Sequence, residues 1–454
     1  TVRAVRFFRG VAEGFPEDGF PVAIYDEAGR TIATGVATRG ENPASGWLTA
    51  PLDRELRIEA GRSYVAAYHA PSGRYAYEYG GLASGVSAPP LSGAPDAGVF
   101  VYGQSIAFPT ETFRSSNYFV DIQFAPARNC GRYTVTDLGV LPGGTVSEGQ
   151  SLDGLTVVGT SQVMQAGGPN RAFVWTASSG LRDLGTLGGS WSFARAVSSG
   201  RVVGVAQTRE GRGHGFLAST ESSMVDLGTL GAAGALDISE ARGVNSSGVV
   251  VGVSRTALGY ERAVRWVDGV IEDLGTLAGI PQSNSAAYAI NGRGQIVGSS
   301  DGNGGNRAAL WEGGAWRALG TISGAPSVAV AVNDVGVAVG YALVQGRYRA
   351  VRYEGDGVED LGTLPGFDSG TYANGIASDG TVVGTAVQRR GEGALVHGFV
   401  YRGQVMVDLN TVLETTGVEV NRATGIDAAG AIVGTGTSAD GGERAVLLTP
   451  VCAP

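Results

Sequence analysis

The feature of this sequence that most constrains its fold is a repeat whose clearest part reads Asp-Leu-Gly-Thr-Leu. It occurs as "DLGTLGG" at 183–189, "DLGTLAG" at 273–279 and "DLGTLPG" at 360–366, each time after a basic residue and a short apolar run. Successive copies lie about 45 residues apart, and Ala318 replaces the acidic residue in one unit. The repeated acidic positions are Asp137, Asp183, Asp226, Asp273, Asp360 and Asp408. This period, with four short apolar segments per unit, predicts the four-stranded blades of a β-propeller rather than a helical repeat.

The order of the segments predicts how the ring closes. The first three segments of the unit occur seven times, and the fourth also occurs seven times. However, the first copy of the fourth segment, "RYTVTDLG" at 132–139, precedes all the others, whereas the last unit ends at "RAVLLTP" without one. We therefore expect seven blades, with the N-terminal segment completing the last blade, because an open ring would leave a strand edge unpaired.

The two cysteines flank this closure. Cys130 stands just before the closing segment and Cys452 just after the last one, so they would be neighbours in the shared blade. In an oxidising compartment they would form a disulfide. Because the two cysteines are far apart in the sequence, they cannot form a CxxC redox motif. We expect neither a bound metal nor a cofactor.

The N-terminal part has strand-like runs but no repeat. "FPVAIYD", "RSYVAAYHA" and "YFVDIQF" are separated by turns rich in Gly, Pro and Ser, a pattern typical of a β-sandwich. The 75 glycines and the charged fraction of only 17% also favour short strands and tight turns. The sequence thus predicts an all-β protein, with an N-terminal β-sandwich at 1–128 and a seven-bladed β-propeller at 129–454.

Both parts resemble bacterial families. Through "VRFFRG", "GRSYVAAYHAPSGRYAY" and "FPTETFRSSNYFVDIQF", residues 1–128 resemble a domain-of-unknown-function family of sandwich modules in secreted proteins. Members usually carry one strand before the segment matching "VRFF", which implies an exposed sheet edge here. Through "RAFVW", "DLGTLGG" and "AINGRGQIVG", residues 130–450 resemble HAF-type extracellular repeats. These resemblances imply a secreted or cell-surface protein in which residues 1–128 are an accessory surface module, and the start at Thr1 without a charged and apolar leader suggests a mature chain.

Each unit also repeats a basic residue in its third segment, near the acidic residue of the fourth. The basic positions are Arg171, His214, Arg262, Arg307, Arg349, His397 and Arg444. In a hairpin the two positions lie near the same end, where opposite charges attract. We interpret them as a structural ring of ion pairs, and anion or sugar binding is the alternative. The glycines two residues after the acidic position, including Gly320, suit a backbone bend or a positive φ.

Function is expected where the units differ. One position of the first segment reads Gly149, Arg195, Arg242, Tyr288, Val330, Asn374 and Thr424. Aromatic rings beside arginine, amide and carboxylate groups suit a carbohydrate or an acidic polymer. The ligand-binding candidates are Trp191, Arg195, Glu240, Arg242, Tyr288, Tyr372 and Asn374. Ordinary packing of the hub and its loops is the alternative.

Other classes of function have less support. A net charge of −9 gives no case for nucleic-acid binding, and no apolar run approaches the roughly 18 residues of a membrane helix. With three histidines and no catalytic sequence motif, an enzyme is not the main expectation. One alternative is a polysaccharide lyase or glycoside hydrolase, with Tyr372 or Tyr288 as base and Arg242 neutralising a carboxylate. Another is a subunit of a surface assembly or filament, whose sandwich edge accepts a strand from a surface protein or a second copy.

Overall fold

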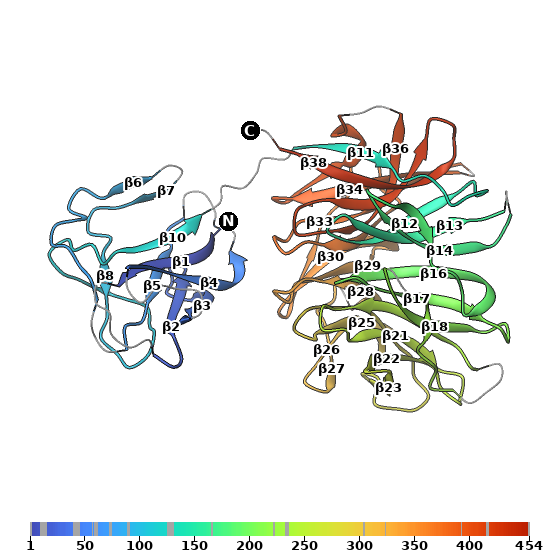
Figure 1. Ribbon diagram of the computed structural model, residues 1–454, viewed down its shortest axis with the longest axis horizontal. Helices are drawn as coiled ribbons and strands as arrows, with labels where there is room; N and C mark the ends of the chain where they lie inside the picture. Colours follow the sequence, from blue (N-terminus) through green and yellow to red (C-terminus); the bar gives the residue numbers. More distant parts are fainter. Residues whose placement is uncertain are drawn as a thin grey trace. The chain divides into compact units, whose positions relative to one another are not determined.

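The protein, described here from a computed structural model, divides into two compact units, Thr1–Asn129 and Cys130–Pro454 (Figure 1). The structure describes residues 2–9, 16–39, 46–56, 58, 62–71, 75–88, 91–124, 131–164, 167–220, 223–231, 236–302, 305–322, 324–391, 393–414 and 417–452. Both units are built from β-strands, and each is described by itself.

In the N-terminal unit, ten strands are described. They are β1 (Val2–Arg9), β2 (Phe20–Tyr25), β3 (Thr31–Ala37), β4 (Gly46–Leu56), β5 (Val65–Tyr68), β6 (Val86–Ala88), β7 (Leu91–Gly93), β8 (Val99–Phe100), β9 (Glu111–Thr112) and β10 (Val120–Phe124). Six form one antiparallel sheet in the order β10-β1-β4-β3-β2-β5, and β6-β7 and β8-β9 are short hairpins. The "VRFF" strand, β1, is paired on both sides, so the exposed edge expected at β1 is not present, and the sheet ends at β10 and β5 instead.

The N-terminal sheet folds over a single core. Phe7 of β1 stacks on Tyr68 of β5 with ring centroids 4.2 Å apart, and it meets the edge of Phe20 of β2 at 5.6 Å. Alternate apolar side chains such as Val22 and Leu48 are buried in the same core, as the two-residue period of a strand requires. β3 joins β4 through one register pair, Gly35 opposite Leu52, and rings from β1, β2 and β5 meet across the core, so the arrangement as two packed sheets stays a prediction.

The C-terminal unit contains seven four-stranded antiparallel sheets within its described residues. The innermost strands are β12 (Ser147–Asp153), β16 (Gly188–Ser198), β20 (Ser239–Val244), β24 (Ser285–Ile290), β28 (Ser327–Val332), β32 (Gly370–Ile376) and β36 (Val418–Ile426). The second strands are β13 (Thr156–Gln162), β17 (Arg201–Thr208), β21 (Val250–Arg255), β25 (Ile296–Gly302), β29 (Ala338–Val344), β33 (Val382–Arg390) and β37 (Ile432–Ser438). Each innermost strand contacts the next, and β36 also contacts β12, so the sheets form a closed ring, the arrangement of a β-propeller.

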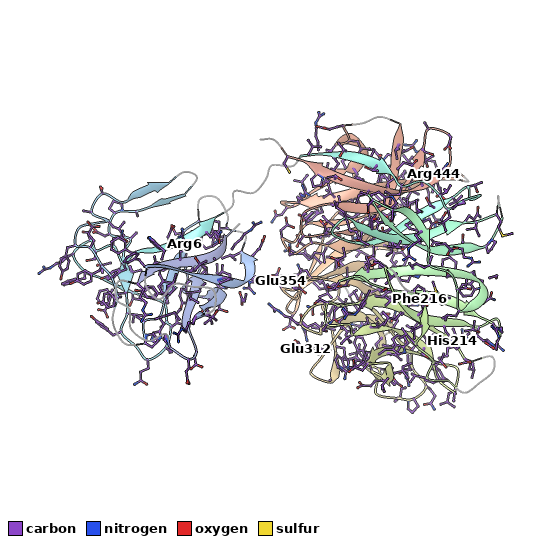
Figure 2. All side chains as sticks on the ribbon, in the orientation of Figure 1. Arg6, His214, Phe216, Glu312, Glu354 and Arg444 are labelled. Carbon is purple, nitrogen blue, oxygen red and sulfur yellow. The ribbon has the colours of Figure 1, made fainter. Side chains whose placement is uncertain are left out.

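The third and fourth strands complete each sheet. The third strands are β14 (Asn170–Thr176), β18 (Gly213–Ser219), β22 (Glu261–Val267), β26 (Gly305–Glu312), β30 (Arg347–Glu354), β34 (Gly393–Arg402) and β38 (Glu443–Val451). The outermost strands are β15 (Gly180–Asp183), β19 (Val225–Asp226), β23 (Val270–Asp273), β27 (Ala315–Ala318), β31 (Gly357–Asp360), β35 (Val405–Asp408) and β11 (Arg132–Asp137). A short 3-10 helix, η2 (Leu409–Thr411), follows β35. Side chains fill the spaces between neighbouring sheets, including that of the fully buried Phe216 (Figure 2).

The last sheet is completed by the first strand of the unit. β11 pairs antiparallel with β38 from Arg132 opposite Val451 to Asp137 opposite Val446, and Figure 1 shows the two side by side. This is the strand exchange that the order of the segments predicts. It removes the open edge that the last sheet would otherwise have.

Every innermost strand carries a β-bulge opposite a glycine of the second strand. In the third sheet the register shifts between Ala241 and Gly243, which makes Arg242 the bulged residue. A Cβ on the opposing Gly252 would lie 2.0 Å from the carbonyl oxygen of Glu240, so a side chain cannot be accommodated there. The same close approach, at 1.8–2.0 Å, occurs at Gly159, Gly204, Gly298, Gly340, Gly384 and Gly434. The "VG" of each second strand is therefore needed for the bulge.

Successive sheets are joined by the Asp-Leu-Gly turn and a buried serine. Ser285 Oγ at the start of β24 donates to the carbonyl oxygen of Gly275 at 2.6 Å and accepts from the backbone N–H of Ala263 at 3.0 Å. The same two bonds are made by Ser147, Ser192, Ser239 and Thr371. Each bridge ties the third strand and the turn of one sheet to the innermost strand of the next.

Cys130 lies outside the described residues, so its link to Cys452 remains a prediction. Peptide mapping of secreted material without reductant should recover Cys130 joined to Cys452. On the chain-entropy model, closing a loop of this length contributes about 5 kcal/mol, so reductant should also lower the unfolding temperature. Two free thiols in folded, secreted protein would contradict the prediction.

Candidate functional site

The variable position of the innermost strand is the bulged residue in each sheet. The bulged residues are Gln150, Arg195, Arg242, Tyr288, Val330, Asn374 and Thr424. In the first sheet the sequence alignment was wrong by one residue, because Gly149 pairs with Gly159 before the bulge and Gln150 occupies it. A bulge redirects a side chain out of the regular alternation of the strand. The repeated backbone feature therefore presents a different side chain from each sheet.

Arg195, Glu240 and Arg242 form a charged cluster across the second and third sheets. Arg195 Nε lies 2.7 Å from Glu240 Oε1, and Arg242 Nη2 lies 2.9 Å from Glu240 Oε2. The side chains of Glu240 and Arg242 are each 19% exposed, whereas that of Arg195 is 37% exposed. The cluster holds two cations against one carboxylate, and charge-assisted bonds fix both guanidinium groups.

Aromatic rings extend the cluster to the fourth, fifth and sixth sheets. The guanidinium carbon of Arg242 lies 4.9 Å from the ring centroid of Tyr288. Tyr341 meets Tyr372 at 5.3 Å and Tyr348 at 5.4 Å between centroids. We call this group the arginine–tyrosine band. Its members are Arg195, Glu240, Arg242, Tyr288, Tyr341, Tyr348 and Tyr372.

The other two predicted ligand residues lie in different settings. Trp191 contacts Phe193 at 5.6 Å, and Arg195 lies 5.7 Å from the Phe193 ring, so Trp191 adjoins the end of the band. Asn374 Nδ2 donates to Thr385 Oγ1 at 3.0 Å and to the carbonyl oxygen of Ala423 at 2.9 Å. These bonds occupy the amide donors of Asn374 within the hub. Sequence reasoning did not select Tyr341 and Tyr348, because they lie on the second and third strands rather than the innermost one.

Charges within the cluster maintain its ionised state. Burial by itself would raise the pKa of Glu240, but Arg242 and Arg195 outweigh it, and the pKa is held below its usual value. Burial would lower the pKa of Arg242, but the charge of Glu240 above all raises it. Arg242 Nη1 is buried and makes no hydrogen bond to the described residues. Such a donor suits an acceptor group of a ligand.

Tyr341 and Tyr372 of the band are poor bases at neutral pH. Burial is the main cause that raises the pKa of Tyr372 and of Tyr341, and neighbouring tyrosines add to it. A general base works best with a pKa near the working pH, so a phenol whose pKa is raised does not suit that task. The protonated hydroxyls can instead donate and accept hydrogen bonds.

The predicted pairs of basic and acidic residues lie within contact distance in six sheets. The pairs are Arg171–Asp183 at 3.9 Å, His214–Asp226 at 2.8 Å, Arg262–Asp273 at 3.5 Å, Arg349–Asp360 at 4.0 Å, His397–Asp408 at 2.6 Å and Arg444–Asp137 at 4.0 Å. In the remaining sheet Ala318 faces the strand of Arg307, which has contacts of its own. The four arginine–aspartate distances, 3.5–4.0 Å, are longer than the distance in an ideal ion pair. The guanidinium groups can therefore also bind other acceptors.

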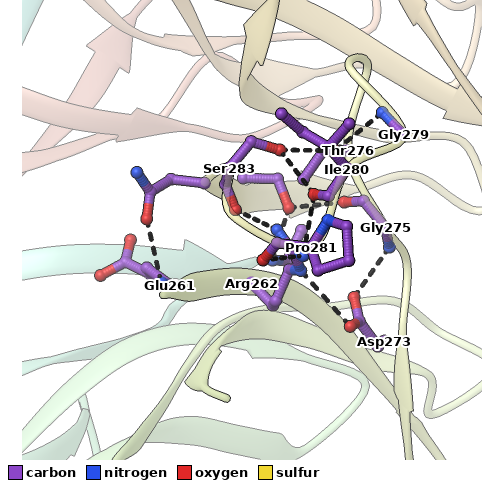
Figure 3. A network of polar contacts seen from close by, with 12 residues as sticks. Glu261, Arg262, Asp273, Gly275, Thr276, Gly279, Ile280, Pro281 and Ser283 are labelled. Atoms are coloured by element: carbon purple, nitrogen blue, oxygen red, sulfur yellow. Dashed lines mark hydrogen bonds and ion pairs between the residues drawn. The ribbon is translucent and has the colours of Figure 1, made fainter. Parts of the chain in front are cut away.

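Arg262 shows this role (Figure 3). It donates to the carbonyl oxygens of Pro281 at 2.9 Å and Ile280 at 3.2 Å, and also to that of Ser283. These carbonyls belong to the loop that crosses from β23 to β24. The arginine thus organises the connection to the next sheet. Its partner carboxylate is also engaged, since Asp273 Oδ1 accepts the backbone N–H of Gly275 at 2.8 Å.

The fourth sheet, in which Ala318 replaces the aspartate, is a natural control for the acidic residue. Where a glycine lies two residues after the aspartate, as in Asp-Leu-Gly, that glycine has a φ of 71–84°. Gly320, which lies two residues after Ala318, does not have a positive φ, so of the two expected conformations the positive φ is not the one present there. The aspartate oxygen therefore favours the left-handed turn, and without it the backbone takes another conformation.

Comparisons with known proteins address the fold rather than the site. Residues 1–120 match the family described as "Domain of unknown function (DUF4082)", and no curated protein matches the sequence. A puromycin-hydrolysing peptidase of Mycobacterium tuberculosis is 13% identical, with a TM-score of 0.42, over 69% of this chain and 52% of its own length. The chain thus spans about half of that peptidase. TolB of Acinetobacter baumannii is 14% identical, with a TM-score of 0.36, over 65% of this chain and 80% of its own.

None of these likenesses carries an activity over to this chain. Within the residues that the structure describes, no helix is long and apolar enough to cross a membrane. The functional argument therefore depends on the geometry of the chain itself.

Replacing Asp273 tests the structural interpretation of the ion-pair ring. Asp273→Ala should lower the free energy of unfolding by about 1–4 kcal/mol, because it removes the acceptor of Gly275 and the partner of Arg262. Asp273→Asn should cost less, since its side-chain oxygen can still accept from Gly275. The control is Glu272→Ala, whose exposed pair with Arg265 should contribute at most about 1 kcal/mol. Loss of ligand binding at unchanged stability would contradict this interpretation.

Proposed function

We propose that this is a secreted or cell-surface protein whose C-terminal unit binds an acidic glycan without catalysis. In this proposal the ring is a seven-bladed propeller of HAF-type extracellular repeats, and the N-terminal unit is an accessory module of sandwich type. The observation that carries the proposal is the guanidinium of Arg242, which is held between Glu240 and the face of Tyr288 and whose buried Nη1 group has no hydrogen-bond partner among the described residues.

The chemistry of the band fits a sugar that carries a carboxylate. Arg195 and Arg242 exceed Glu240 by one positive charge, which favours an anion. Arg242 bonds to Glu240 through Nε and Nη2, so its Nη1 group is the one that can donate to a sugar carboxylate. The ring faces of Tyr288 and Tyr372 provide apolar surfaces against which a sugar ring can stack. A uronate-containing polysaccharide combines these features.

Binding without bond cleavage follows from the same residues. Tyr372 of the band has a raised pKa, so its hydroxyl is protonated at neutral pH. A lyase would need a base near the sugar carboxylate whose pKa lies close to the working pH. The band supplies hydrogen bonds and stacking, which suffice for recognition.

Two substitutions test this function. With polygalacturonate as the probe, Arg242→Ala combined with Tyr372→Ala should weaken binding by about tenfold or more. Binding to the unaltered protein should also weaken as ionic strength rises. The isolated unit 130–454 should retain the affinity, and no unsaturated product or new reducing end should appear.

Arg265→Ala is the matched control for Arg242→Ala. Arg265 also pairs with a carboxylate, Glu272 at 2.7 Å, and lies 4.7 Å from an aromatic ring, that of Trp311, but it is on a third strand outside the band. This variant should bind polygalacturonate within about twofold of the unaltered protein. Equal binding by the double variant, or equal loss in the control, would contradict the proposal.

A further inference from the structure

The N-terminal unit carries a continuous network of seven aromatic rings. In order of contact they are Phe113, Tyr79, Tyr77, Tyr75, Tyr118, Phe100 and Tyr102, with successive ring centroids 4.9–6.0 Å apart. We call this the tyrosine surface. It shares no residue with the arginine–tyrosine band, which belongs to the other unit.

The tyrosine surface is largely open to solvent. Tyr102 is 75% exposed, Tyr79 52% and Tyr77 47%, and Phe113 and Tyr75 are also exposed. Burial of such rings in a core would be favourable, so their gathering on the surface calls for an explanation. Large exposed aromatic patches mark sites where another molecule binds.

Three of the rings form a row along one segment. Tyr75, Tyr77 and Tyr79 are alternate residues, and their rings contact in succession at 6.0 and 4.9 Å between centroids. Neighbouring ring planes are inclined to each other by 53° and 69°. Successive exposed rings offer several contacts to a ligand that repeats along its length.

The backbone beneath the row is firmly held. The N–H and C=O groups of Glu78 bond to those of Asn117 at 2.9 Å in both directions, and the N–H of Gly80 bonds to the carbonyl oxygen of Arg114 at 3.0 Å. Arg114 and Ser115 both have a φ of 50°, a conformation that non-glycine residues rarely adopt. Strained backbone of this kind is retained where the surroundings require a particular geometry. The rings are therefore arranged before any ligand arrives.

The surface is polar at its edges, where tyrosine hydroxyls lie in pairs. The hydroxyls of Tyr77 and Tyr79 lie 3.2 Å apart, and those of Tyr75 and Tyr102 lie 3.4 Å apart. The hydrogen bond to Tyr102, together with burial, raises the pKa of Tyr75 to about 12, so this hydroxyl stays protonated. The cation in the network is Arg114, whose guanidinium lies over two rings, Tyr79 at 5.3 Å and Phe113 at 5.1 Å.

We propose that the tyrosine surface binds a neutral polysaccharide chain, whose sugar rings stack on the row Tyr75–Tyr77–Tyr79 and on Tyr102. Apolar ring faces with hydroxyls at their edges match sugar rings, which also have apolar faces and hydroxyl edges. Among the described residues of this surface, Arg114 is the cation that lies over the rings, and no pair of arginines like that of the band is present. The protein would thus hold two different glycans, one on each unit.

The test uses the full chain and a panel of neutral polysaccharides, namely xyloglucan, galactomannan and a soluble β-1,3-glucan, in affinity electrophoresis. At least one of these should retard the unaltered protein. Tyr77→Ala combined with Tyr102→Ala should weaken that binding by about tenfold or more, whereas Tyr77→Phe with Tyr102→Phe should change it by less than about threefold, because the rings remain. Both side chains are exposed, so the fold should be unaffected.

Two controls separate this proposal from the proposed function. Trp47→Ala removes another exposed ring of the same unit, one that also carries a guanidinium, that of Arg6 at 5.3 Å, and it should leave binding unchanged. Arg242→Ala should leave neutral binding unchanged, and the tyrosine variant should still bind polygalacturonate. The proposal is overturned if no neutral polysaccharide binds, if the alanine pair binds normally, or if that pair instead abolishes self-association of the protein.

Discussion

The close approach of an innermost-strand carbonyl to a second-strand glycine is the contact on which the propeller depends. At Gly252 a Cβ would lie 2.0 Å from the carbonyl oxygen of Glu240, and the same approach recurs in every sheet. Because glycine leaves room, the innermost strand can bulge at its centre, and the bulge turns one side chain out of the sheet. The same bulge therefore shapes the centre of each sheet and positions the variable residue of the candidate site. It recurs in all seven sheets with a different residue at that position in each.

The joints between sheets follow a second repeated arrangement. An aspartate oxygen accepts the N–H of the turn glycine, and the carbonyl of that glycine accepts the hydroxyl of a buried serine in the next sheet, as at Asp273, Gly275 and Ser285. Buried polar groups that are all paired specify one geometry, whereas a missing partner is costly. The Asp-Leu-Gly repeat is thus explained by assembly of the ring, which leaves the bulged positions free to vary.

Much of this architecture could be predicted from the sequence, because periodicity reports directly on repeated structure. The early copy of the fourth segment predicted the pairing of β11 with β38. The bulge could not be read from the sequence, so Gly149 was aligned where Gln150 belongs. The role of the buried serines could not be predicted from the sequence. Serine is common in loops, and the groups that these serines bond to lie in a neighbouring sheet.

The N-terminal unit shows a different limit. Its strands alternate clearly, but nothing local indicates whether β1 lies at an edge or inside a sheet, and the structure places it inside. The row Tyr75–Tyr77–Tyr79 is visible in the sequence, yet its exposure depends on contacts with residues 113–118. Likewise, the partners of Arg242 come from separate strands, so its pairing with Glu240 and Tyr288 emerges only in the folded ring.

The most direct test of this account is the stability and polygalacturonate affinity of Gly252→Ala beside Gly393→Ala. In Gly252→Ala the added methyl group would meet the carbonyl oxygen of Glu240 beneath the bulge. In Gly393→Ala the nearest atom to the added methyl group would be the carbonyl oxygen of Arg390, 3.7 Å away. We expect Gly252→Ala to lower the free energy of unfolding by about 1–3 kcal/mol or more and to weaken binding, because Arg242 is displaced. Gly393→Ala should change neither. If both variants were equally stable and bound equally well, the bulge would not be the feature on which hub and site depend.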